Sequence, residues 1–91
     1  MIYFIEIVGE TPVKIGHTSK PIKKRLSQLQ VSSPKPMRVI ATVDGGKATE
    51  SVIHLIFKDD LIRGEWFQRS DDLLEFLEGC SDYEDLDEDD A

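Results

Sequence analysis

The chain of 91 residues has little cysteine and no long apolar run, and each shortage excludes a class of protein. Its single cysteine, Cys80, cannot form an internal disulfide or a cysteine-based zinc site, which fits a reducing compartment. The opening apolar run has seven residues, is preceded by no basic residue and contains Glu6. Such a run is too short to span a membrane and differs from a secretory signal, so we expect a cytoplasmic protein without a membrane partner.

Basic residues are scarce in the last third of the chain. Residues 59–91 contain two Lys or Arg against fourteen Asp or Glu, whereas residues 1–58 contain nine against four. The formal net charge of −7 therefore hides a basic front part that suits a polyanionic partner such as DNA. In residues 82–90 seven of nine residues are acidic, and such a run cannot bury enough apolar surface to fold. We expect one domain over residues 1–79 and a disordered acidic tail over residues 80–91.

The apolar residues that are present predict a β-hairpin at the start of the chain. An aromatic and β-branched run is followed, after Gly9-Glu10 as a two-residue turn, by a second apolar run that ends in glycine. In that antiparallel register Tyr3 lies opposite Gly16 and Lys14 lies opposite Ile5, so Tyr3 and Lys14 share one face. A phenol and an ammonium group beside a glycine suit a phosphate. The alternative is a packed strand aromatic and a solvated lysine.

The rest of the chain predicts three helices, one further strand and a short extended segment. Pro21 lies in the first turn of a helix that Ser19 or Lys20 caps, and Ser70 caps a last helix that ends at Gly79. Residues 37–43 are expected to form a strand that ends before Asp44-Gly45-Gly46, and helical spacing predicts a helix over residues 47–58. Residues 59–63 are expected to be a polar connection before the extended segment 64–67, whose aromatics cover the core.

Two helical positions carry side chains that suit phosphate or metal chemistry. Arg25 flanks the apolar stripe of the first helix, from where its guanidinium can reach a phosphate; the alternative is extension into solvent. Glu50 and His54 lie four residues apart and can aim at one point; the alternatives are a surface charge and a hydrogen-bonded packing histidine. The opposite, buried side of that helix is expected to comprise Ala48, Val52, Leu55 and Ile56.

These residues together resemble the GIY-YIG endonuclease superfamily, and its small phage and prophage branch in particular. The resemblance rests on Ile2-Tyr3-Phe4-Ile5, Lys14-Ile15-Gly16, Arg25, Glu50 and the Gly-Glu-Trp-Phe sequence at 64–67, and it covers about residues 2–78. Met1 stands where the first motif has Gly, and Lys14 stands where the second has Tyr. The resemblance implies an α+β fold, a three-stranded antiparallel sheet flanked by helices in the order β-β-α-β-α with a further C-terminal helix.

The resemblance also implies a Mg²⁺- or Mn²⁺-dependent DNA endonuclease of a phage or prophage DNA-processing system. Tyr3 would position or deprotonate the attacking water, Arg25 would bind the phosphate, and Glu50 would be the protein ligand of the metal. Lys14 would favour the phenolate of Tyr3, because an adjacent positive charge lowers the pKa of an acid. His17 would share the proton transfer, and His54 would lie beside the site.

The leading alternative is a catalytically weak or inactive binding module of the same fold, which acts on a protein or nucleic-acid partner. In that interpretation the acidic tail is the regulatory element that contacts a protein partner, or it imitates DNA. The oligomeric state is left open by the sequence.

Overall fold

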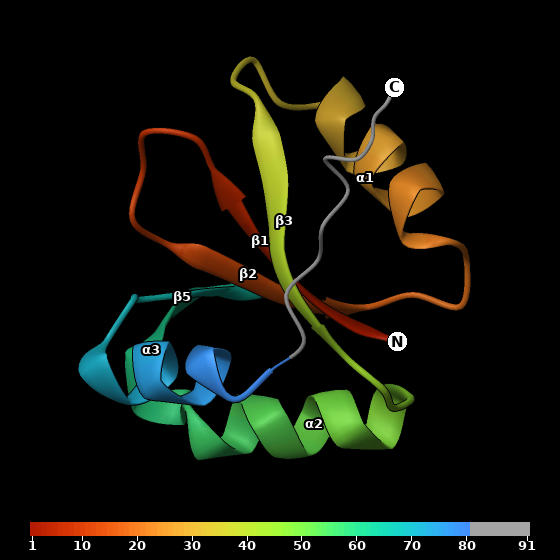
Figure 1. Cartoon of the computed structure of the whole chain (residues 1–91). Coiled ribbons are helices and arrows are strands. Elements are labelled where there is room, and N and C mark those ends of the chain that lie inside the picture. Colours follow the sequence, from red (N-terminus) through yellow and green to blue (C-terminus); the bar gives the residue numbers. More distant parts are fainter. Residues whose placement is uncertain (81–91) are drawn as a thin grey trace.

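The computed structural model describes residues 1–80, so the acidic tail predicted for residues 80–91 lies outside them except for its first residue. Five strands form one antiparallel sheet in the order β3-β1-β2-β5-β4, and three α-helices pack around it (Figure 1). The elements are β1 (Ile2–Ile7), β2 (Val13–His17), α1 (Ile22–Val31), β3 (Met37–Val43), α2 (Lys47–Ile56), the 3-10 turn η1 (Lys58–Asp60), β4 (Leu61–Arg63), β5 (Trp66–Phe67) and α3 (Asp71–Glu78). Within residues 1–80 no helix has the length and apolar character needed to cross a membrane.

The α+β class is confirmed, but the prediction of three strands is wrong because residues 61–67 add a hairpin to the sheet. The segment 59–63, expected to be a polar connection, contains part of η1 and the edge strand β4. Strand β5 pairs with β2 and sets Trp66 opposite Lys14. All three residues of β4 are exposed, and a strand of only three residues is too short to show a periodic apolar pattern.

The predicted register of the opening hairpin is confirmed, although its turn is different. Tyr3 pairs with Gly16 and Ile5 pairs with Lys14. The Glu10 amide donates to the Ile7 carbonyl at 2.9 Å, so the turn is centred one residue earlier than predicted and Gly9 is its third residue. Gly9 has a φ of +92°, which a glycine adopts without the steric cost that a side chain would impose.

The two faces of the sheet are covered by different helices, as Figure 1 shows. Helix α1 packs on the face that presents Tyr3 and Ile5, with Leu26 and Leu29 against them as the helical stripe predicted. Helices α2 and α3 cover the opposite face, where Phe4 belongs to the larger apolar cluster. Because side chains alternate along a strand, β1 supplies both cores.

Helix α2 is rotated relative to the prediction. Its buried residue is Ile53, and Phe57 at its C-cap is also buried. The residues predicted to be buried are instead exposed: Ala48, Val52, Leu55 and Ile56. Apolar residues occur on two sides of this helix, so periodicity alone fits two orientations, and only packing against the sheet selects one.

Helix ends agree with the sequence in one case and differ in another. The Leu73 amide donates to the Ser70 hydroxyl at 3.1 Å, which confirms the predicted cap of α3. Helix α1 has Pro21 at its N-cap without a side-chain cap, so the prediction of Ser19 or Lys20 is wrong. The Thr18 hydroxyl accepts from the Lys20 amide at 2.9 Å and orders the preceding turn instead.

Candidate functional site

Tyr3 lies fully buried between β2 and α1. Its ring rests on Gly16, where an added Cβ would lie only 2.5 Å from the Tyr3 Cζ atom. Arg25, half-buried on α1, donates from Nε to the Tyr3 hydroxyl at 3.4 Å. Since the guanidinium has five donors and uses one here, it can bind an anion while it remains beside the phenol. The hairpin and α1 thus join two of the predicted site residues.

Lys14 is not the solvated charge of the alternative interpretation. Its side chain is 16% exposed, its Nζ lies 3.2 Å from Oε1 of Glu65, and it sits 5.6 Å from the centre of the Trp66 ring. Glu65 was not predicted as a site residue. Its position in the Gly-Glu-Trp-Phe sequence was the signal that could have indicated a site residue. Glu65 reaches Lys14 because this segment pairs with β2, and that pairing was not predicted.

Glu50 is not a surface charge, because its side chain is only 15% exposed on the inner side of α2. Burial raises the pKa of its carboxyl, and the charge and hydrogen bonding of Glu65 raise it further. His54 and His17 act in the opposite direction, without reversing the shift. The two carboxyl groups therefore form a pair in which Lys14 balances Glu65, and Glu50 has no lysine or arginine partner among residues 1–80. Such a pair favours either a shared proton or a bound cation.

His54 is held by packing and by the backbone of β2. Its Nε2 lies 2.8 Å from the Ile15 carbonyl and 3.7 Å from Oε2 of Glu50, and its ring packs 4.9 Å from that of Phe67. A carbonyl only accepts, so Nε2 carries the proton and cannot offer a lone pair to a metal. His54 therefore fixes the position of α2 against β2 and lies beside Glu50, as the packing alternative described.

Strand β2 links two groups of site residues. Tyr3 and Arg25 form one group on the α1 face. Glu50, His54 and Glu65 form the other group at the open edge of β2, which is the part of the strand after Lys14 that does not pair with β5. Among residues 1–80 no hydrogen bond or ion pair joins Arg25 or Tyr3 directly to Glu50. Two β2 residues are connected to the second group, since Lys14 pairs with Glu65 and His17 acts on the charge of Glu50.

The described surface charges are divided between the two faces of the sheet. The start of α1 exposes Lys20, Lys23 and Lys24 next to Arg25. Helix α3, on the opposite face, exposes four carboxylates: Asp71, Asp72, Glu75 and Glu78. Several of the basic residues that give residues 1–58 their positive charge therefore lie near the Tyr3 and Arg25 group. The side covered by α2 and α3 also exposes Lys47 and Lys58 in addition to the carboxylates of α3.

Comparison with known families gives one match over most of the chain. The model of the T5orf172 domain matches residues 1–84, and this is a phage-associated domain that occurs in nuclease-related proteins. No curated protein and no solved structure matches the chain. The match spans the hairpin, both groups of site residues and α3. The chain belongs to the T5orf172 domain family.

Proposed function

We propose that the protein is a metal-dependent DNA endonuclease of the GIY-YIG type. The observation that carries the proposal is the arrangement around β2, with a phenol and a guanidinium on one side and a carboxylate pair at the open edge. Hydrolysis of a phosphodiester needs a positioned water, positive charge on the phosphoryl oxygens and help for the leaving oxygen. These residues can supply each of them, and the family match supports a nuclease-related role.

The residues at the open edge fit a divalent cation. Glu50 and Glu65 offer carboxylate oxygens, and Glu50 has no lysine or arginine partner among residues 1–80. Residues 1–80 contain no cluster of three or more His, Cys, Asp or Glu side chains that would form a complete metal cage. Mg²⁺ suits such a site, because it is commonly held by one or two carboxylates while it keeps several waters and binds substrate phosphate. When bound, the metal would stabilise negative charge on the leaving oxygen.

The other side of β2 would handle the phosphate and the attacking water. The Tyr3 hydroxyl is buried beside Arg25, whose remaining donors would bind a phosphoryl oxygen next to it. Lys14 lies on the same face, where it is paired with Glu65. His17 alternates to the opposite face, where it acts on Glu50, and would accept or return a proton on that side. Lys20, Lys23 and Lys24 would bind flanking phosphates and supply the salt-dependent part of the affinity.

A second function, a binding module without catalysis, is favoured by one specific observation. The charge of Lys14 is already balanced by Glu65, and the Tyr3 hydroxyl is already occupied by Arg25. If these contacts persist with DNA bound, the protein would hold a nucleic acid without cutting it. In that case the acidic tail would serve a protein partner or regulate access to the basic face.

The two functions are separated by incubating the full chain with supercoiled plasmid in the presence of Mg²⁺, of Mn²⁺ and of EDTA. The endonuclease proposal predicts conversion to nicked or linear plasmid with either metal and none with EDTA. A matched gel-shift assay in EDTA reports binding separately from cleavage. A plasmid that is bound but uncut with every metal would establish the binding module instead.

A further inference from the structure

The outer side of α2 presents an apolar surface that neither the fold nor the proposed chemistry uses. We propose that this outer α2 face, comprising Ala48, Val52, Leu55 and Ile56, is a self-association surface that pairs two copies of the chain with their α2 helices antiparallel. The proposal is independent of the nuclease function, because Glu50 and His54 lie on the inner side of the same helix.

The outer α2 face exposes large apolar side chains to solvent. Val52, Leu55 and Ile56 are 55%, 66% and 61% exposed, although Ile53 on the same helix is 4% exposed. The four positions of the outer α2 face are spaced at i, i+4, i+7 and i+8, which is the apolar pattern of a helix packed against another helix. Isolated exposed apolar side chains are ordinary, but a contiguous apolar helix face indicates a contact surface.

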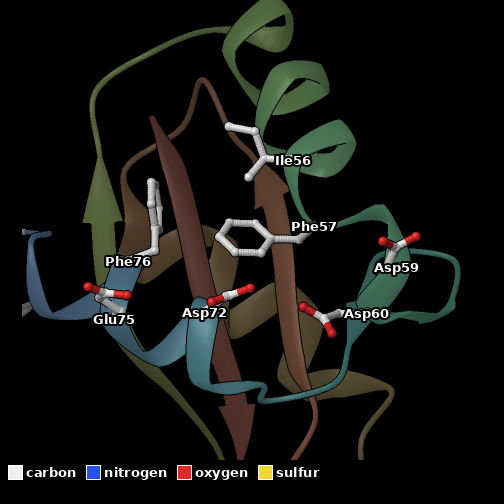
Figure 2. A pocket seen from close by; sticks show the side chains of 7 residues that line it. All are labelled: Ile56, Phe57, Asp59, Asp60, Asp72, Glu75 and Phe76. Carbon is white, nitrogen blue, oxygen red and sulfur yellow. The ribbon is translucent and has the colours of Figure 1, made fainter.

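The C-terminal end of this face opens into an acidic pocket of about 390 Å³. Figure 2 shows the rings of Phe57 and Phe76 at its centre, with Ile56 at one end and carboxylates around it. The carboxylates belong to Asp59, Asp60, Asp72 and Glu75. Asp60 accepts from the Ser70 hydroxyl at 2.6 Å, but within residues 1–80 no lysine or arginine pairs with any of the four. The pocket therefore suits a cation.

An antiparallel pair of α2 helices would cover the outer α2 face and also supply a cation to the acidic pocket. The outer α2 face is centred on residue 52, so a two-fold axis there sets the small Ala48 against the partner's larger Leu55 and Ile56. Residue 47 then lies opposite the partner's residue 57, and the partner's Asp59 follows two residues later in η1. The exposed Lys47 side chain spans that offset easily. Each copy thus offers Lys47 to the partner's acidic pocket, as a two-fold interface requires.

The size of the contact predicts a weak dimer. A ten-residue helix is about 15 Å long, so one helix face per copy falls at or below the low end of stable interfaces, which bury about 1,200–2,000 Å² in total. We therefore expect a monomer–dimer equilibrium that depends on concentration rather than a permanent dimer.

Sedimentation velocity of the full chain over a wide concentration range at physiological ionic strength tests the proposal. We expect a concentration-dependent shift from monomer to dimer, which Leu55→Glu weakens by about tenfold or more. Val31→Glu is the matched control, because Val31 is 86% exposed on α1, away from this face, and should leave the equilibrium unchanged. A monomer at every concentration, or a dimer that Leu55→Glu does not weaken, would overturn the proposal.

A charge exchange tests the antiparallel register. Asp59→Lys makes the chain less acidic, so general repulsion would fall and any non-specific association would strengthen. The proposed register predicts the reverse, a dimer weakened about threefold or more, because the introduced ammonium group would face Lys47 of the other copy. Adding Lys47→Glu restores opposite charges and the original net charge, and should recover the wild-type equilibrium. Failure of the double variant to recover it would contradict this register.

Discussion

The ring of Tyr3 lies on the backbone of Gly16, on the neighbouring strand, so closely that no side chain fits between them. This contact places the phenol below Arg25 and makes the glycine a steric requirement of the site. The same strand carries Lys14 toward Glu65 and runs past Glu50. The candidate chemistry is thus built around β2, and several of its consequences can be measured.

Gly16→Ala should disrupt the position of Tyr3. The new Cβ would lie 2.5 Å from Cζ and 2.8 Å from Cε1 of the ring, so the ring or the strand must move. We expect a loss of about 1–3 kcal/mol in the free energy of unfolding, the usual cost of overpacking, together with reduced cleavage. Denaturant unfolding measures the first effect. Gly79→Ala is the matched control, because Gly79 has a helical backbone conformation and an added Cβ there lies 3.6 Å from the Phe76 carbonyl oxygen, an ordinary contact.

Tyr3→Phe should separate chemistry from binding. The ring still packs on Gly16, and only the hydroxyl that accepts from Arg25 is lost. If the hydroxyl positions or deprotonates water, single-turnover cleavage should fall by ~10²–10⁴, whereas the affinity for a DNA duplex in EDTA should change little. A variant with wild-type turnover would remove Tyr3 from the mechanism.

The raised pKa of Glu50 predicts how metal and pH act on stability. Burial and the nearby Glu65 favour the neutral carboxyl, so in metal-free protein the contribution of Glu50 to stability is present below its unfolded pKa and is lost as pH rises through its raised folded pKa. Mg²⁺ binds the ionised form and should therefore raise Tm at neutral pH more than at acidic pH.

Thermal unfolding with and without Mg²⁺, at acidic and at neutral pH, measures the effect. Glu50→Gln should abolish the Mg²⁺-dependent shift, and Glu78→Gln, an exposed change on α3, should retain it. An equal shift in the wild-type protein and Glu50→Gln would exclude Glu50 as a metal ligand.

Glu6 provides a prediction about stability that is separate from the site. Burial alone would raise its pKa, but hydrogen bonds from Arg69 and Arg38, and their charges, outweigh burial and lower it. Its contribution is therefore present above the unfolded pKa of about 4.3 and is lost as pH falls through the lower folded value. Glu6→Gln should cost ~3 kcal/mol at neutral pH, since it leaves Arg69 without its buried partner.

The comparison for this effect is Glu10→Gln, because Glu10 pairs with Lys35 in an exposed bridge worth about 0–1 kcal/mol. Urea unfolding of both variants at neutral and acidic pH gives the two differences. Equal costs for Glu6 and Glu10 at neutral pH would show that the buried network does not stabilise the fold.

Local sequence signals predicted the parts of the fold that depend on local rules. The apolar run of β1, the glycine opposite Tyr3 and the Ser70 cap are local features, and each was confirmed. The orientation of α2 was not predictable in this way, because its sequence has two apolar sides and the sheet selects the one with Ile53. The same limitation hid the burial of Glu50, which follows from that orientation.

Non-local pairing accounts for what the sequence did not reveal about the site. Glu65 becomes a neighbour of Lys14 and Glu50 only because β5 pairs with β2, a contact between segments about fifty residues apart. Likewise, the sequence does not indicate that Arg69 is the partner of Glu6. The two residues meet only because the segment that precedes α3 lies beside β1 in the folded chain. Strand pairing across such separations is set by the whole sheet rather than by either segment.

The most direct test of the metal-dependent mechanism is a single-turnover plasmid cleavage assay with Mg²⁺ that compares the wild-type protein, Glu50→Gln and Glu78→Gln at equal concentration. This mechanism predicts that the wild-type protein and Glu78→Gln convert supercoiled plasmid at the same rate, that EDTA stops both, and that Glu50→Gln is slower by about 10² or more. Circular dichroism spectra that coincide for the three proteins exclude misfolding as the cause. Cleavage by Glu50→Gln at the wild-type rate, or the absence of any cleavage by the wild-type protein, would contradict it.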